Sequence, residues 1–194
     1  MKNFLIIDLE ATCDQNGHIS RSTMEVIEIG AVVIDTESFD ILETFQGYIK
    51  PVINPRLTDF CIELTGITQN IVQEAPYFYE TLSTFGEWLN SFKCLNFWGS
   101  WGAYDKNQIE QDCTRHNQDN PLSALKHYNL KTAYAAALNT RSKGMANAYK
   151  EIGQELIGRH HSGVDDAVNI ARLLKLAPQF GLYLKKHIAL SEDA

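Results

Sequence analysis

Residues 4–12 of the chain read FLIIDLEAT, a short apolar run that closes on two acids. A run of this length, rich in β-favouring Phe and Ile, predicts a buried strand. Side chains alternate between the two faces of a strand, so Asp8 and Glu10 project from the same side. Two neighbouring buried carboxylates repel each other, and a bound divalent cation removes that cost. The alternative is an edge strand whose acids face water, and the spacing alone favours neither interpretation.

The length and charge of the chain restrict the class of protein. Its 194 residues suffice for one domain with a full core, so we expect a single domain over residues 1–194. The formal net charge of -7 counts against a protein that coats nucleic acid, because no basic field would attract the polymer. A metal-dependent enzyme remains compatible with this charge, since bound cations neutralise acids locally.

The cysteines and the N-terminal pattern predict a compartment. No two cysteines form a C-x-x-C pair, so a zinc knuckle is disfavoured and reduced thiols in a cytosolic protein fit best. Asp8 and Glu10 interrupt the first apolar stretch, so it is neither a signal peptide nor a membrane span. We therefore expect a cytoplasmic protein that has no membrane partner.

The strands predicted along the chain suggest a mixed sheet. Residues 25–35 (EVIEIGAVVID) and 41–49 (ILETFQGYI) follow the first strand with short links, which indicates an antiparallel meander. Two further short strands are expected at residues 94–98 and 125–130. Helices are predicted around them, at residues 58–66, 76–92, 106–117, 132–138, 146–153 and 164–176, with a short turn beginning at Thr68 and with Pro178 ending the last helix. This order of elements predicts an α/β layered domain.

A third acid follows the predicted strand at residues 94–98. Asp105 ends the stretch WGSWGAYD, residues 98–105, where the chain passes from a strand into a helix. The simplest role for an isolated Asp at this place is to cap the helix. The aromatic residues Trp98, Trp101 and Tyr104 would stack on nucleic-acid bases if exposed, although aromatic residues more often pack in a core.

A histidine and two acids lie together near the end of the chain, in HHSGVDD at residues 160–166. His161 precedes a predicted helix that begins with Asp165 and Asp166. The ordinary pKa of histidine, about 6.5, suits a general base at neutral pH, and a nearby acid can hold a metal ion. The alternatives are a structural or surface histidine, and acids that only stabilise the N-terminus of the helix.

In this order and spacing, Asp8-x-Glu10, Asp105, His161 and Asp166 resemble the DEDDh (DnaQ-like) family of 3′→5′ exonucleases. The chain is most similar to the Eri-type exoribonucleases within that family, through DLEATC (8–13), EIGA (28–31), LTGIT (64–68), SW (100–101) and HSGVDD (161–166) followed by NIA (169–171). The family's histidine-to-aspartate interval falls on Asp166 and leaves Asp165 as a neighbour. One departure is that residues 102–104 separate Trp101 from Asp105, whereas several members place the aspartate directly after the tryptophan.

The resemblance implies a fold and a mechanism. The fold would be a ribonuclease H-like three-layer domain whose mixed, mostly five-stranded sheet is flanked by helices. Two Mg²⁺ or Mn²⁺ ions would serve as cofactors. Asp8 would bridge both ions, Glu10 and Asp166 would bind the ion that carries the attacking water, and Asp105 would hold the second ion through water. His161 would take the proton from the attacking water.

The resemblance also implies a substrate. The expected reaction releases nucleoside 5′-monophosphates from single-stranded 3′ ends, with RNA favoured over DNA. The candidate substrate contacts are Leu9, Ala11, Thr12, Leu64, Thr65, Ile67, Trp101 and His161. Three alternatives stay open at this point: a DNA proofreading or repair exonuclease, a phosphodiesterase for very short oligonucleotides, and a nucleic-acid-binding module that does no chemistry.

Overall fold

A mixed five-stranded sheet forms the middle of the molecule in the computed structural model, which describes residues 3–192. The strand order is β3-β2-β1-β4-β5. The first three strands pair antiparallel as a meander, while β4 and β5 run parallel to β1. The bounds are β1 Asn3–Ala11, β2 Val26–Asp35, β3 Ile41–Tyr48, β4 Leu95–Ser100 and β5 Lys126–Asn129. The predicted mixed sheet and α/β class are confirmed.

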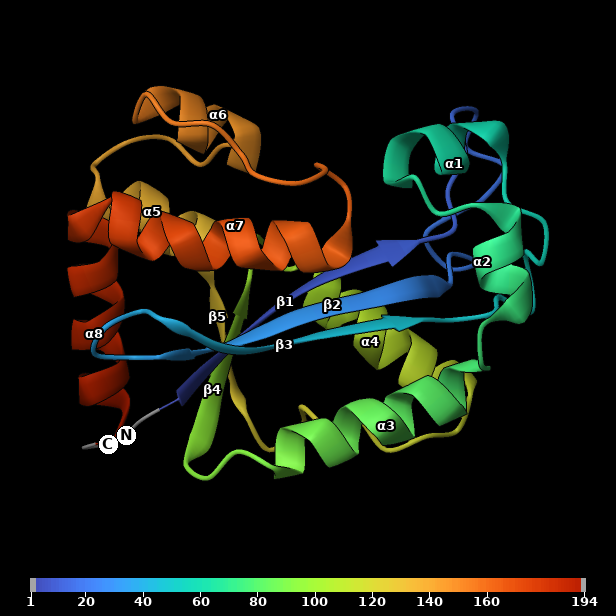
Figure 1. The fold of residues 1–194 in the computed structure, drawn as a ribbon, viewed down its shortest axis with the longest axis horizontal. Coiled ribbons are helices and arrows are strands. Elements are labelled where there is room, and N and C mark those ends of the chain that lie inside the picture. The colour runs from blue at the N-terminus through green and yellow to red at the C-terminus, as the bar shows by residue number, and fades with distance from the viewer. Residues whose placement is uncertain (1–2, 193–194) are drawn as a thin grey trace.

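Helices cover both faces of this sheet (Figure 1). Their bounds are α1 Asp59–Thr65, α2 Gln69–Glu74, α3 Phe78–Asn90, α4 Tyr104–Arg115, α5 Leu130–Ala137, α6 Met145–Glu151, α7 Gly163–Leu176 and α8 Pro178–Glu192. One layer holds α5 to α8, the opposite layer holds α3 and α4, and α1 and α2 lie at one end of the sheet. None of the helices within residues 3–192 is long and apolar enough to cross a membrane.

The last helix, α8, is absent from the sequence prediction, which took Pro178 only as the end of α7. Pro178 is instead the first residue of α8. Proline fits the first helical position, because its N–H would be unpaired there in any case and its φ angle is already helical. Phe180, Leu184 and Ile188 then recur at helical spacing and are buried in the same core as α7.

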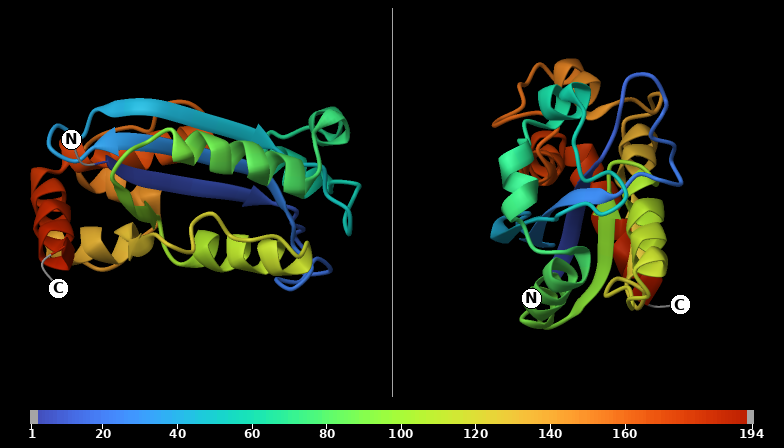
Figure 2. Two further views of the ribbon diagram at one scale, coloured as in Figure 1. Left: turned by 90° about the horizontal axis from the view of Figure 1, so that it is seen from below. Right: turned by 90° about the vertical axis from the view of Figure 1, so that its right-hand side faces the viewer.

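Alternate residues of β1 contribute to different cores. Phe4 and Ile6 pack with α7 and α8 on one face of the sheet. Leu5, Ile7 and Leu9 pack with α3 and α4 on the other face, which Figure 2 shows from the α3 side. Asp8 and Glu10 continue the first series, so the period of the strand directs both acids toward the layer of α7.

The beginning of α7 lies directly against β2. A Cβ atom on Gly30 would meet the carbonyl carbon of Gly163 at 1.9 Å, so only a glycine permits this contact. Gly30 pairs with Asp8 across the sheet. The buried carboxylate of Glu28 accepts hydrogen bonds from the N–H groups of Gly163 at 3.1 Å and Val164 at 3.3 Å. These contacts fix the first turn of α7 beside Asp8.

This contact predicts the effect of adding a single methyl group. Gly30→Ala should lower the free energy of unfolding by about 1–3 kcal/mol or more, because the methyl group overlaps backbone atoms that cannot move aside alone. Urea unfolding followed by circular dichroism measures the change. The matched control is Gly86→Ala within α3, where a Cβ atom has its nearest neighbour at 3.9 Å and should be tolerated or slightly stabilising. Equal stability of the two variants would contradict this account.

Candidate active site

Three of the predicted acids converge at the end of β1. Asp8, Glu10 and Asp166 each offer a carboxylate oxygen, and these oxygens all lie within 4.8 Å of one another. Asp8 and Glu10 come from β1, and Asp166 comes from the first turn of α7. Figure 1 shows the start of α7 beside the tip of the β1 arrow. Glu10 and Asp166 are buried, whereas Asp8 is partly accessible.

The fourth acid, Asp105, is held against the same strand. It lies in the first turn of α4, and its Oδ1 accepts the backbone N–H of Leu9 at 3.0 Å. The registered pairs of β1 with β4 end at Ile6, so this N–H lies beyond them. The helix-capping alternative is not what the structure shows, since the N-cap residue is Ala103. Asp105 therefore lies beside Asp8, whose pKa its negative charge raises.

Burial disfavours the charged form of all four acids, and repulsion by neighbouring acids adds to it at Asp8, Glu10 and Asp105. The pKa of Asp8 lies well above its usual value, firstly because of burial and then because of the charges of Asp105 and Glu10. Burial, followed by the charge of Glu28, raises the pKa of Glu10 to about 9. Burial also raises the pKa of Asp105 to about 6 and shifts that of Asp166 upward. A divalent cation would favour ionised carboxylates here, and oxygen ligands suit a hard cation.

His161 lies next to Asp166 in a constrained loop. Its φ angle is 64°, in the left-handed region that few residues other than glycine adopt. Its backbone N–H donates to Oδ2 of Asp166 at 3.0 Å, which fixes the loop to the acid cluster. Burial and the neighbouring His160 lower the pKa of His161, although Asp166 opposes them. The imidazole is therefore mainly neutral at pH 7 and able to accept a proton.

The sequence reasoning assigns no role to two groups that the structure places at the site. Nδ1 of His160 lies 3.0 and 3.1 Å from the two carboxylate oxygens of Asp166, and its ring stacks on that of His161 with centroids 4.1 Å apart. Glu28 lies opposite Glu10 in the sheet and bonds the first turn of α7. The signals in the sequence are a histidine doublet and an acid inside a strand of mostly apolar residues.

The candidate substrate contacts fall on two segments beside the acids. Leu9 and Ala11 lie at the end of β1, and Thr12 directly follows it, where its hydroxyl accepts the N–H of Glu25 at 3.0 Å. Thr65, at the end of α1, donates its hydroxyl to the Cys61 carbonyl. In this second segment Leu64 is partly exposed, while Thr65 and Ile67 are buried. Their contact with a substrate stays a prediction.

Trp101 has protein partners of its own. Its indole N–H donates to the carbonyl of Lys143 at 3.0 Å, and its ring packs against Tyr134 and Phe180. The ring is only partly buried. These contacts fix its position in the α5 and α8 layer, and its predicted role in stacking on a base stays a prediction.

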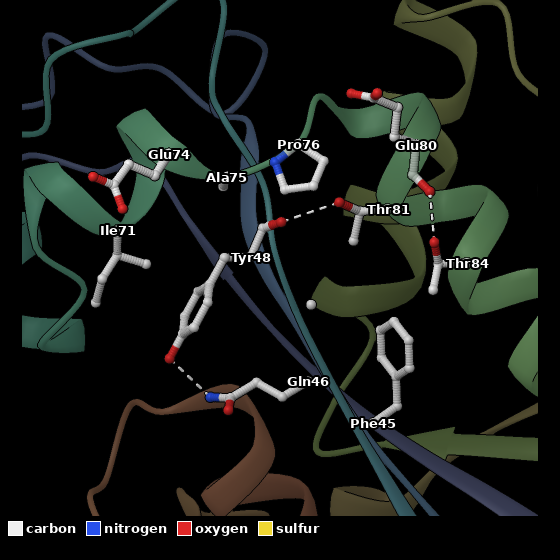
Figure 3. A pocket seen from close by; sticks show the side chains of 11 residues that line it. Phe45, Gln46, Tyr48, Ile71, Glu74, Ala75, Pro76, Glu80, Thr81 and Thr84 are labelled. Atoms are coloured by element: carbon white, nitrogen blue, oxygen red, sulfur yellow. Dashed lines mark hydrogen bonds between the residues drawn. The ribbon is translucent and has the colours of Figure 1, made fainter.

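A hollow of about 390 Å³ opens elsewhere, between the exposed strand β3 and helices α2 and α3 (Figure 3). Thr81 donates its hydroxyl to the carbonyl of Tyr48 at 3.0 Å, and Gln46 donates to the Tyr48 hydroxyl at 2.9 Å. None of the four converging acids lines this hollow. The candidate active site is therefore identified by its carboxylates and not by the shape of this cavity.

Comparisons with known proteins show what this chain is similar to. The family described as Exonuclease (RNase_T) matches residues 5–174. The mouse protein named 3′-5′ exoribonuclease 1 is 35% identical over 189 residues, which cover 93% of this chain and 54% of that protein. Human ERI1 exoribonuclease 3 is 32% identical over 190 residues, covering 94% and 56%. This chain thus spans about half the length of the curated relatives it matches.

Solved structures show the same fold. The nuclease domain of 3′hExo, described as a DEDDh family member bound to rAMP, superposes with a TM-score of 0.81 at 31% identity, covering 89% of each chain. A 3′-exonuclease in a structure of histone mRNA stem-loop recognition gives a TM-score of 0.83 at 29% identity, covering 92% of this chain and 64% of the other. The ribonuclease H-like exonuclease fold predicted from the sequence is confirmed.

The raised pKa of Glu10 predicts how the metal-free protein responds to pH. A carboxyl whose pKa is raised on folding contributes stability that is complete below its unfolded value, 4.5, and is lost as the pH rises toward about 9. Glu10→Gln has no carboxyl group to ionise at this position, so the variant does not lose this stability as the pH rises. The free energy of unfolding of the variant minus that of wild type should therefore increase from pH 5 to pH 9. Urea unfolding in excess EDTA measures it, and a constant difference would contradict the shifted pKa.

Proposed function

Because the chain belongs to the RNase_T exonuclease family, we propose that it is a metal-dependent 3′→5′ exonuclease that releases nucleoside 5′-monophosphates from single-stranded RNA. The observation that carries this proposal is the convergence of Asp8, Glu10 and Asp166 beside His161, inside the matched region. Relatives named exoribonucleases, and a related exonuclease solved in a study of histone mRNA recognition, support RNA as the substrate.

The acids suit divalent cations. Asp8, Glu10 and Asp166 would hold one Mg²⁺ or Mn²⁺ ion, because their oxygens already lie close together and their charges repel one another. Asp8 and Asp105 would hold a second ion. When bound, two such ions activate water and stabilise the charge that develops on the phosphate in phosphodiester hydrolysis. We thus propose two bound ions, and Mg²⁺ or Mn²⁺ as their identity.

The side chains around the ions would act on the water and on the terminal nucleotide. His161, neutral at pH 7, would take the proton of the attacking water at its imidazole, and its bond to Asp166 keeps the loop in place. The end of β1 and the segment Leu64–Ile67 would hold the terminal nucleotide. The chain carries 17 basic residues against 24 acidic ones, so binding of RNA should be modest and sensitive to salt.

The cellular location is also a proposal. The four cysteines are free thiols, which suits a reducing compartment, and we propose the cytoplasm. Fractionation of cells that produce the tagged protein would decide between the cytoplasm and other compartments.

The activity predicts a ladder of products. With Mg²⁺, 5′-labelled single-stranded RNA should shorten one nucleotide at a time from its 3′ end, and faster than DNA of the same sequence. EDTA should stop the reaction and Mn²⁺ or Mg²⁺ should restore it. Asp8→Asn should lose activity and keep its fold, since it removes one of several repelling charges. The matched control Asp119→Asn changes an exposed acid outside the cluster and should match wild type.

Three outcomes would contradict the proposal. Wild-type protein that leaves every oligonucleotide intact would favour a binding module, and a higher rate on DNA would favour a DNA exonuclease. Full activity of Asp8→Asn would exclude the acid cluster as the reaction centre.

The proton acceptor predicts a separate loss of turnover. His161→Ala should lower kcat on saturating RNA by about 10²–10⁴, the usual range for a lost general base, with KM little changed. His18→Ala, at an exposed histidine of the β1–β2 connection, is the control. Single-turnover kinetics separate the chemical step from product release. Unchanged kcat in His161→Ala would assign the proton to another group.

A further inference from the structure

An arginine side chain joins two segments that flank the acid cluster. The histidine loop, residues 157–162, precedes α7 and contains His160 and His161. From this loop, Nη2 of Arg159 donates to the backbone carbonyl of Glu63 at 2.7 Å, a contact between residues 96 positions apart. Glu63 lies in the last turn of α1, directly before the segment 64–67 that we assign to the terminal nucleotide.

The carbonyl that Arg159 binds has no partner within its own helix. In a continuing helix it would accept the N–H of Ile67, but α1 ends at Thr65 and that N–H donates to the Thr65 hydroxyl at 3.1 Å. Arg159 therefore satisfies a carbonyl that the end of the helix leaves free. The contact therefore follows from the place where α1 ends.

Gly66 provides the space for the guanidinium. This glycine ends α1 with a φ angle of 75°, and a Cβ atom there would meet Cζ of Arg159 at 2.5 Å and Nε at 2.6 Å. The planar guanidinium thus lies against the backbone of Gly66. A glycine is required both for the left-handed conformation and for this close approach.

The backbone of Arg159 is hydrogen-bonded to α7. Its N–H donates to Oδ2 of Asp165, in the first turn of α7, at 2.8 Å. Gly158 makes room for this carboxylate, because a Cβ atom there would meet Cγ of Asp165 at 2.4 Å. Asp165 accordingly shapes the histidine loop, and its neighbour Asp166 faces the acid cluster. Arg159 is fixed to α7 through its backbone and to α1 through its side chain.

We propose that Arg159 is a positioning residue that holds the terminal-nucleotide segment, residues 64–67, at a fixed place relative to His161. The proposal rests on the proposed exonuclease function for what these two segments do. If the segment binds the last nucleotide, any shift of α1 moves the scissile phosphate relative to the proton acceptor. A misplacement of about 1 Å can cost on the order of 10² in rate.

Hydrogen exchange tests the link without any assay of activity. Arg159→Met keeps an unbranched apolar side chain and removes every donor, so backbone amides in residues 59–67 and 157–163 should exchange faster than in wild type. Arg159→Lys keeps a cationic donor but not the planar contact with Gly66. Its amides in these residues should exchange at rates between those of wild type and Arg159→Met. Arg141→Met, at an exposed arginine of the α5–α6 connection, is the control and should match wild type. Unchanged exchange in residues 59–67 of Arg159→Met would overturn the proposal.

A double-mutant cycle then tests whether Arg159 acts through His161. Arg159→Met should lower kcat on single-stranded RNA by about 10- to 100-fold, with a smaller change in KM and an unchanged melting temperature. In a His161→Ala background the same change should cost little more, because the group it positions is gone. If the double mutant instead shows the full kcat losses of Arg159→Met and His161→Ala combined, the proposal is overturned. If wild-type protein cleaves no RNA, the proposed function is contradicted. The hydrogen-exchange result then decides by itself whether Arg159 links α1 to the histidine loop.

Discussion

Four carboxylates share one end of β1, and their mutual repulsion is the cost that the surrounding structure has to meet. The alternation of β1 directs Asp8 and Glu10 to one side, while the N–H of Leu9 holds Asp105. Asp166 is brought by α7, which the contact between Gly30 and Gly163 holds on the sheet. Each acid is held by backbone geometry or a backbone donor, so the cluster persists although burial raises the pKa of every member.

Most of the sheet and the acids could be predicted because their signals are local. The period of β1 fixes the side of Asp8 and Glu10, and the short polar link after Asp35 indicates a hairpin. α8 was missed because a proline after a helix has two meanings, an end and a beginning. The spacing of Phe180, Leu184 and Ile188 favours the second meaning, and it becomes decisive only once these side chains are seen in the core.

Contacts between distant segments could not be predicted in this way. Glu28 belongs to the EIGA stretch of the family resemblance, yet nothing near it in the sequence indicates that it binds Gly163, 135 residues later. The place of Asp165 became clear only from its bond to the backbone of Arg159. His160 likewise has no pattern that separates it from His161. The family resemblance includes Glu28 and Asp165 in its stretches, but it assigns them no supporting role, and only their contacts in the fold reveal one.

The docking of α7 on β2 also has a consequence for how the protein is made. β1 and β2 are synthesised before α7, so Gly163 and Asp166 emerge from the ribosome only after both strands. A nascent chain therefore carries Asp8 and Glu10 as an incomplete pair that lacks the third carboxylate and His161. The proposed nuclease chemistry must wait until the C-terminal helices have folded onto the sheet.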